Sequence, residues 1–234
     1  MGDRKAAGPA CQFGPRGQLE SLRASRVNRA WYARDALVVA RALLGCVLVH
    51  ERADGGFRAS RIVETEAYRG ARDLACHARA GLTQRTRSLL GEEGHAYVFL
   101  VYGMHYCFNV TCAGVGRGHA VLVRAGEPTL GFGEGERLDG PGRFARAMGI
   151  SKRIDACDLT EPPLYFSERR GRPRIGVTPR VGVAYSGDWA NRAWRFYDAT
   201  SSHVSRPPRS SIGSGTLMGP PRRPSGRERT VRRP

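Results

Sequence analysis

Hydrophobic and polar positions alternate along residues 61–68, whose sequence is RIVETEAY. Successive side chains of a β-strand point to opposite faces, so this alternation predicts a strand with two distinct faces. One predicted face gathers the acidic and aromatic side chains: Ile62, Glu64, Glu66 and Tyr68. The other predicted face carries Arg61, Val63, Thr65 and Ala67. Two carboxylates beside a phenol ring predict a site that binds a flat ring and activates water.

The remaining pattern predicts short helices and further strands. Asp35 stands where it can cap a helix of regularly spaced apolar residues, and Gly45 is placed to end it. A second helix is predicted to open at residues 140–142 and to end near Gly149. Strands are predicted over residues 46–50, 57–68, 96–101, 105–111, 120–125 and 174–185. This pattern is typical of an α+β fold with mostly antiparallel pairing.

The strands at residues 96–101 and 105–111 are separated by three residues, which predicts a β-hairpin with Tyr102 at its tip. In the second arm of this hairpin the large apolar side chains take one face, which leaves Asn109 on the other. In the next strand two valines oppose Leu122 and Arg124. These three side chains could therefore share a cavity with Glu66, although spacing alone favours a structural ion pair for a buried carboxylate near an arginine.

The net charge indicates a polyanionic partner. The formal net charge is +17, and only Lys5 and Lys152 among the 38 basic residues are lysines. Arginine binds phosphate as a fork and stacks on bases, so nucleic acid is the expected partner. A bias towards arginine can equally reflect genome composition, but that bias does not explain the excess over 21 acidic residues.

The charge is distributed unevenly, which predicts three segments. Residues 205–234 hold eight arginines against one glutamate, with repeated Pro, Ser and Gly, and are predicted to form a disordered Arg-rich tail. Residues 1–29 are predicted to be a weakly structured basic N-terminal segment. The folded domain is expected over residues 30–204. We expect the tail to add affinity for nucleic acid without specificity.

No run approaches eighteen apolar residues and no apolar segment follows the N-terminal charges, so a cytoplasmic protein is expected, at the nucleoid if it is bacterial. The six cysteines are scattered, and reduced thiols are expected. A zinc site at Cys107 and Cys112 is disfavoured because alternation puts them on opposite faces. A Cys–His hydrolase at Cys76 and His77 is disfavoured because adjacent strand residues point apart. No metal and no cofactor are expected.

Several segments together carry a resemblance to a known family. In chain order they are RIVETEAY (61–68), CH (76–77), AYVFLVYGMHYCFN (96–109), VLVRAGEP (121–128), GPGRF (140–144), RVGV (180–183) and WRFY (194–197). The chain resembles the alkyladenine (3-methyladenine) DNA glycosylases, bacterial type, across about residues 30–204. The resemblance implies a single compact domain with a curved, mostly antiparallel sheet and a protruding β-hairpin.

The resemblance also implies an activity. It is that of a monofunctional base-excision repair enzyme, which flips alkylated or deaminated purines out of duplex DNA and hydrolyses the N-glycosidic bond. Glu66 falls at the position of the general base, and Arg124 falls where an arginine helps to hold the attacking water. Tyr102 matches the residue that wedges into the gap left by the flipped base. A monomer is expected, with duplex DNA containing damaged purines as its partner.

The same resemblance implies how the base is recognised. Tyr68 would stack on one face of the flipped base, with His77 and Phe99 on the other. Asn109 and Leu122 match positions that exclude the exocyclic amine of normal guanine. The alternative hypothesis is a catalytically weak, Arg-rich nucleic-acid-binding protein on the same fold. The presence of both the glutamate and the arginine argues against that alternative, and the sequence does not rank the possible lesions.

Overall fold

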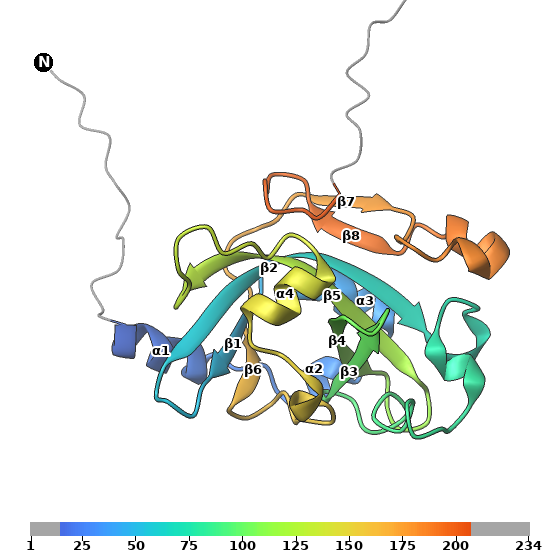
Figure 1. Ribbon diagram of the computed structural model, residues 1–234, viewed down its shortest axis with the longest axis horizontal. Coiled ribbons are helices and arrows are strands. Elements are labelled where there is room, and N and C mark those ends of the chain that lie inside the picture. The colour runs from blue at the N-terminus through green and yellow to red at the C-terminus, as the bar shows by residue number, and fades with distance from the viewer. Residues whose placement is uncertain (1–14, 207–234) are drawn as a thin grey trace, which may run out of the picture.

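The computed structural model describes residues 15–206 of the 234-residue chain (Figure 1). Its strands form one curled sheet in which the paired strands are antiparallel. They are β1 Val47–Glu51, β2 Phe57–Arg69, β3 Ala96–Val101, β4 His105–Cys112, β5 His119–Leu130, β6 Leu164–Ser167, β7 Ile175–Thr178 and β8 Arg195–Asp198. The order is β3-β4-β5-β2-β1-β6, and β8 joins β2 to β7. The predicted α+β class, single domain and curved antiparallel sheet are confirmed.

The helices are short and pack around the curled sheet (Figure 1). The α-helices are α1 Pro15–Ala24, α2 Arg29–Tyr32, α3 Ala36–Leu43 and α4 Pro141–Ala147. The 3₁₀ helices are η1 Gly70–Arg72, η2 His77–Ala80, η3 Lys152–Ile154 and η4 Ala184–Asn191. Within residues 15–206, no helix combines the length and apolar character needed to cross a membrane.

Helix α3 forms as its sequence predicts and closes one side of the core. The Asp35 side chain accepts a hydrogen bond from the backbone N–H of Leu37 at 2.9 Å, which caps the helix. Its buried residues are spaced by three and four, as an amphipathic helix requires: Ala36, Val39, Ala40 and Leu43. Gly45 has a φ of 84°, a left-handed conformation that lets the chain turn directly into β1.

Strand β2 departs from simple alternation, and the departure shapes the site. Its register against β5 shifts between Ile62 and Thr65, which marks a β-bulge. Ile62 packs into the main core together with Ala67, whereas Glu66 lies on the other face. The prediction that Ile62 shares a face with the two glutamates is therefore wrong. The bulge adds one residue, so the alternation before residue 63 does not continue after it.

The β3–β4 hairpin matches its prediction, with β3 over the expected residues and β4 one residue longer. Tyr102 and Gly103 both have positive φ, 51° and 69°, as the central residues of a type I′ turn require. The N–H of Met104 donates to the carbonyl oxygen of Val101 at 3.1 Å and closes the turn. The Tyr102 side chain is 89% exposed, so the turn presents an aromatic ring to solvent.

The folded unit extends past both boundaries expected from the sequence. Helix α1 lies in the segment expected to be weakly structured, where Leu22 is buried against β1 and β6. Ser205 and Arg206, at the start of the expected tail, are hydrogen-bonded into the fold. The predictions for residues 1–14 and 207–234, including the disordered Arg-rich tail, lie outside the described residues.

Two other expectations need correction near the C-terminus. Only residues Ile175–Thr178 of the strand predicted over 174–185 form a strand, and the remainder leads into η4. Strands β6 and β8 were not expected. Each has only four residues, which is too short to show a clear alternating pattern. They form strands because β6 pairs with β1 and β8 pairs with β2.

Candidate active site

A cavity of about 610 Å³ lies along the hairpin, from its base to its tip, and against the sheet. Its walls come from the end of β2, from η2, from strands β3 to β5, from the start of α4 and from two later segments, residues 181–183 and 205–206. Seven of the eight site residues expected from the sequence line this cavity: Tyr68, His77, Phe99, Tyr102, Asn109, Leu122 and Arg124. The eighth, Glu66, is fully buried directly behind the lining.

A single row of side chains across the sheet explains why residues distant in sequence meet. Asn109 of β4 pairs with Leu122 of β5, and Leu122 pairs with Glu66 of β2. The row continues to Tyr97 on one side and to Arg195 on the other. Partners directly opposite each other on neighbouring strands face the same side of a sheet. The register, set by apolar residues packing on the reverse face, therefore assembles this wall.

The Glu66 carboxylate is held by three neighbours. Its Oε1 accepts a hydrogen bond from the backbone N–H of Val181 at 2.7 Å, and its Oε2 accepts one from the Tyr68 hydroxyl at 2.9 Å. The Arg124 guanidinium lies 3.4 Å from Oε1. All three neighbours line the cavity, so the carboxylate sits one layer behind the cavity surface.

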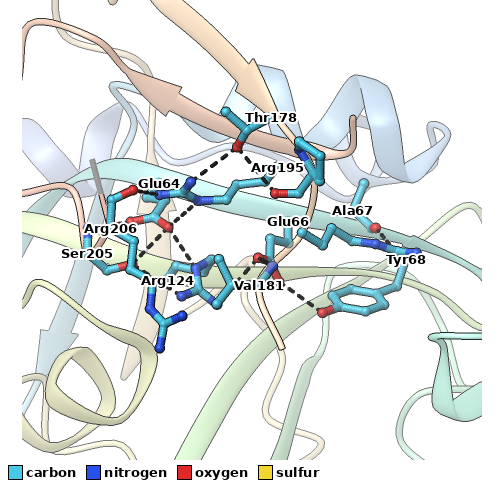
Figure 2. Close-up of polar contacts among 12 residues, drawn as sticks. Glu64, Glu66, Ala67, Tyr68, Arg124, Thr178, Val181, Arg195, Ser205 and Arg206 are labelled. Atoms are coloured by element: carbon cyan, nitrogen blue, oxygen red, sulfur yellow. Dashed lines mark hydrogen bonds and ion pairs between the residues drawn. The ribbon is translucent and has the colours of Figure 1, made fainter. Parts of the chain in front are cut away.

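A second carboxylate, Glu64, joins Arg124 to a buried network (Figure 2). Its Oε1 accepts hydrogen bonds from Nε of Arg124 and Nε of Arg195, each at 2.7 Å. Ser205 donates its N–H to Oε2 at 2.6 Å and its hydroxyl to Oε1 at 2.9 Å. Glu64 is fully buried, and both arginines are at most 6% exposed. Two buried carboxylates are thus balanced by two buried guanidinium groups.

The opposite charges in this network stabilise one another, as the directions of the pKa shifts indicate. Burial alone would raise the pKa of Glu64, but Arg124 and Arg195 outweigh burial and hold it below its ordinary value. Burial opposes the charge of Arg124, yet Glu66 and Glu64 raise its pKa overall. Burial, and then the neighbouring Glu66 carboxylate, raise the pKa of the Tyr68 phenol well above its ordinary value. Tyr68 is therefore a neutral hydrogen-bond donor to Glu66.

Aromatic side chains form another part of the lining. The rings of His77 and Phe99 meet edge to face with centroids 4.6 Å apart. The His77 Nδ1 is 2.8 Å from the Tyr97 hydroxyl, and its Nε2 is 3.4 Å from Nη2 of Arg85. Burial, assisted by Arg85, lowers the pKa of His77 to about 4. The imidazole is therefore uncharged near neutral pH.

Tyr68 is backed by a buried ion pair that the sequence did not indicate. The Arg180 guanidinium lies over its ring, with Cζ 4.7 Å from the centroid. Arg180 donates to both carboxylate oxygens of Asp73, at 2.5 and 2.9 Å, and to the carbonyl oxygen of Ala67 at 3.0 Å. The ring is fixed by this contact and by its own bond to Glu66.

Comparison with known proteins identifies the family. The model of the methylpurine-DNA glycosylase family matches residues 30–202, which is most of the chain. The chain belongs to the methylpurine-DNA glycosylase family. DNA glycosylases act in base excision repair by cutting the N-glycosyl bond between a base and its sugar, so family membership indicates a DNA substrate and a hydrolase.

Curated relatives cover the same part of the chain. A protein of Myxococcus xanthus named "Putative 3-methyladenine DNA glycosylase" is 50% identical over 181 residues, which are 76% of this chain and 93% of the relative. Proteins of the same name from Legionella pneumophila and Anaeromyxobacter dehalogenans are 42% and 48% identical over 184 and 185 residues. These cover 77% and 78% of this chain, and 98% and 87% of the relatives.

The lysine within residues 15–206 is placed away from the cavity. Lys152 lies on η3, where its Nζ contacts Asp155 at 2.8 Å and the Val98 carbonyl oxygen at 3.1 Å, and it does not line the cavity. Among residues 15–206 no group of three or more His, Cys, Asp or Glu side chains is placed to hold a metal ion.

The cysteines are placed partly as predicted. Cys107 lines the cavity and Cys112 packs in the core, so the two lie on opposite faces as alternation predicted. Cys76 and His77 stand at the start of η2 and both line the cavity, so the strand geometry expected for them is wrong. Burial raises the pKa of the Cys76 thiol to about 11, which keeps it protonated and unreactive.

Proposed function

We propose that the protein turns an alkylated or deaminated purine out of duplex DNA into this cavity and hydrolyses its N-glycosidic bond, leaving an abasic site. One observation carries the proposal: a fully buried carboxylate, Glu66, stands immediately behind a cavity lined by Tyr68, His77 and Phe99. Catalysis on a base within a duplex requires that the base leave the stack, and a lined cavity then receives it.

In the proposed reaction Glu66 accepts the proton of the attacking water. Each oxygen of the carboxylate accepts one hydrogen bond from the protein and keeps a lone pair for another. The water would enter between Arg124 and Val181, the two neighbours of Oε1 that line the cavity. The negative charge of Glu66 would also stabilise the positive charge that develops on the sugar as the bond to the base breaks.

The aromatic lining suits an electron-poor base. Alkylation at N3 or N7 makes a purine cationic, and a cation is attracted to the faces of aromatic rings. We assign Tyr68 to one face of the base, and His77 with Phe99 to the other. The low pKa of His77 supports this role, because an imidazolium would repel a cationic purine.

Two further contacts would select the base and keep the duplex open. Asn109 is 3% and Leu122 is 6% exposed, and the Asn109 amide is fixed by donation to the Tyr97 carbonyl oxygen at 3.0 Å. A rigid wall at this place would exclude the exocyclic amine of guanine. Tyr102, exposed at the hairpin tip and also at the cavity edge, would fill the gap that the flipped base leaves.

The proposed reaction is hydrolysis without a covalent intermediate. A glycosylase with lyase activity needs an amine to form a Schiff base. Within residues 15–206 the one lysine, Lys152, does not reach the cavity, and Lys5 lies outside the described residues. Borohydride should therefore trap no adduct between enzyme and DNA. A trapped adduct that disappears in Lys152→Ala would refute this part of the proposal.

The proposal is tested with duplexes that each carry one lesion: 3-methyladenine, 7-methylguanine, hypoxanthine or ethenoadenine. Excision would release the free base and leave an abasic site that alkali cleaves. Undamaged duplexes should give no cleavage. Binding to DNA without cleavage of any lesion would favour the alternative, a catalytically weak nucleic-acid-binding protein. We further propose that the protein acts as a monomer on duplex DNA in the cytoplasm.

A further inference from the structure

We propose that residues 205–206 form an arm of the active site, which places the Arg206 guanidinium against a DNA phosphate next to the flipped nucleotide. This inference rests on the proposed function, because it assumes that a base enters the cavity. It assigns Arg206 a fixed contact at the site, in contrast to the non-specific contacts expected of an Arg-rich tail.

The arm is held from both sides by buried side chains (Figure 2). Ser205 donates two hydrogen bonds to Glu64, from its backbone N–H at 2.6 Å and from its hydroxyl at 2.9 Å. Nη2 of Arg124 lies 3.2 Å from the same hydroxyl, and Nη2 of Arg195 donates to the carbonyl oxygen of Arg206 at 2.5 Å. Hydrogen bonds to charged groups are stronger than neutral ones, so this position is well defined.

The anchoring network is larger than the proposed chemistry requires. Glu66 needs a partner such as Arg124, but Glu64 and Arg195 make no contact with the cavity surface. Burying two further charges is costly unless each is fully paired. Arg195 satisfies this condition only through Glu64, Thr178 and the Arg206 carbonyl oxygen. The arm is therefore part of how the network is satisfied.

Arg206 differs from the other arginines that line the cavity. Arg124 is paired with two glutamates, Arg143 is paired with Asp139 at 2.8 Å, and Arg85 lies over the Phe99 ring. The Arg206 side chain is exposed and makes no ion pair or hydrogen bond with any residue from 15 to 206. Its backbone is fixed while its guanidinium remains available to a ligand.

The chemistry of the ligand follows from the position. When a base enters the cavity, its sugar and the two flanking phosphates must stay at the cavity mouth, because they remain joined to the DNA strand. A guanidinium binds phosphate through two parallel hydrogen bonds and is the preferred side chain for that task. The expected ligand of Arg206 is therefore one particular phosphodiester beside the lesion.

The test uses the full-length protein with the substitution Glu66→Gln, so that binding is measured without turnover. Duplexes carry one ethenoadenine, and each nearby phosphate is replaced in turn by an uncharged methylphosphonate. One replacement next to the lesion should weaken binding about tenfold. Adding Arg206→Ala should weaken binding to the ethenoadenine duplex that keeps all its phosphates by a similar factor. It should also abolish the effect of that one replacement.

Arg172→Ala is the matched control, because Arg172 is exposed and does not line the cavity. It should leave the effect of the methylphosphonate unchanged. Arg206→Lys should recover part of the affinity, since it keeps the charge but not the fork. If every methylphosphonate still weakens binding of the Arg206→Ala protein as before, or if no duplex is bound at all, the proposal is wrong. Failure of the wild-type protein to excise any lesion would count against the proposed function, and it does not affect this binding result.

Ser205→Ala tests the anchoring. Ser205 is a positioning residue, since it acts by holding Arg206, and the substitution removes its hydroxyl from Glu64 and Arg124. Binding should weaken about threefold, and the effect of the same methylphosphonate should become smaller. Affinity and phosphate sensitivity equal to those of the parent protein would show that the arm is not held by this hydroxyl.

Discussion

The two sides of the cavity are built in opposite ways. The inner wall, by which we mean the lining at Arg124 together with the buried charged residues directly behind it, consists of Glu64, Glu66, Arg124 and Arg195, each with two or more polar partners. The hairpin tip consists of Tyr102 and Met104, which are 89% and 72% exposed. A group that moves protons must be held in one geometry, whereas a group that enters DNA must be free of protein contacts. The rigid inner wall therefore suits the proposed chemistry, and the exposed tip suits the proposed contact with DNA.

Removing a charge from the inner wall should have the largest effect on stability. Arg124→Met leaves Glu66 without its guanidinium and Glu64 with Arg195 alone, so the free energy of unfolding should fall by about 3–5 kcal/mol. Arg137→Met is the control, since its pair with Asp139 involves a side chain that is 68% exposed and should cost about 0–1 kcal/mol. Urea denaturation measures both. Equal losses would contradict the distinction between the wall and the exterior.

A change at the hairpin tip should affect flipping and leave the fold intact. Tyr102→Ser removes the proposed wedge, so excision should slow on the order of tenfold for a lesion opposite a normal base. The defect should shrink when the lesion is opposite an abasic site, because that base is already easily extruded. Single-turnover excision on both duplexes gives the comparison. The same defect on both would mean that the ring serves another purpose.

The smallest effect should come from the titration of His77, which belongs to neither region and lies in the aromatic lining of the cavity. Its pKa in the folded protein is about 4, below the ordinary value of 6.5. Between pH 6.5 and 4 the unfolded chain therefore binds the proton and the folded protein does not, so protonation favours unfolding as the pH falls.

Replacing His77 with phenylalanine should thus reduce the loss of unfolding free energy between pH 7 and pH 5. Urea denaturation at both values measures it, and His105→Phe, on an exposed residue, should leave the loss unchanged. A loss in His77→Phe as large as in the wild type would show that the imidazole does not stay neutral in the fold.

Much of the site was predictable where alternation is regular. Residues 107–109 and 121–124 follow strict alternation, so Asn109, Leu122 and Arg124 were correctly assigned to one cavity. Alternation failed at the bulge in β2, where the register against β5 shifts and the partner on the other edge changes from β1 to β8, because no local sequence pattern marks that point.

Residues brought to the site from a distance were not predictable. Arg195 and Ser205 are 131 and 141 positions from Glu64, and no local pattern links them. Arg180 was within a segment that resembles the family, but nothing in its spacing showed that it would back Tyr68. Helix α1 was missed because its few apolar residues form a core only against β1 and β6.

The central claim is that Glu66 on the inner wall activates the water. The most direct measurement compares wild-type and Glu66→Gln proteins in single-turnover excision of one lesion at saturating enzyme, with binding to the same duplex measured alongside. The account predicts that excision falls by at least ~10²-fold while binding is retained, since the amide keeps the shape but cannot take a proton. Excision by Glu66→Gln at close to the wild-type rate would contradict it.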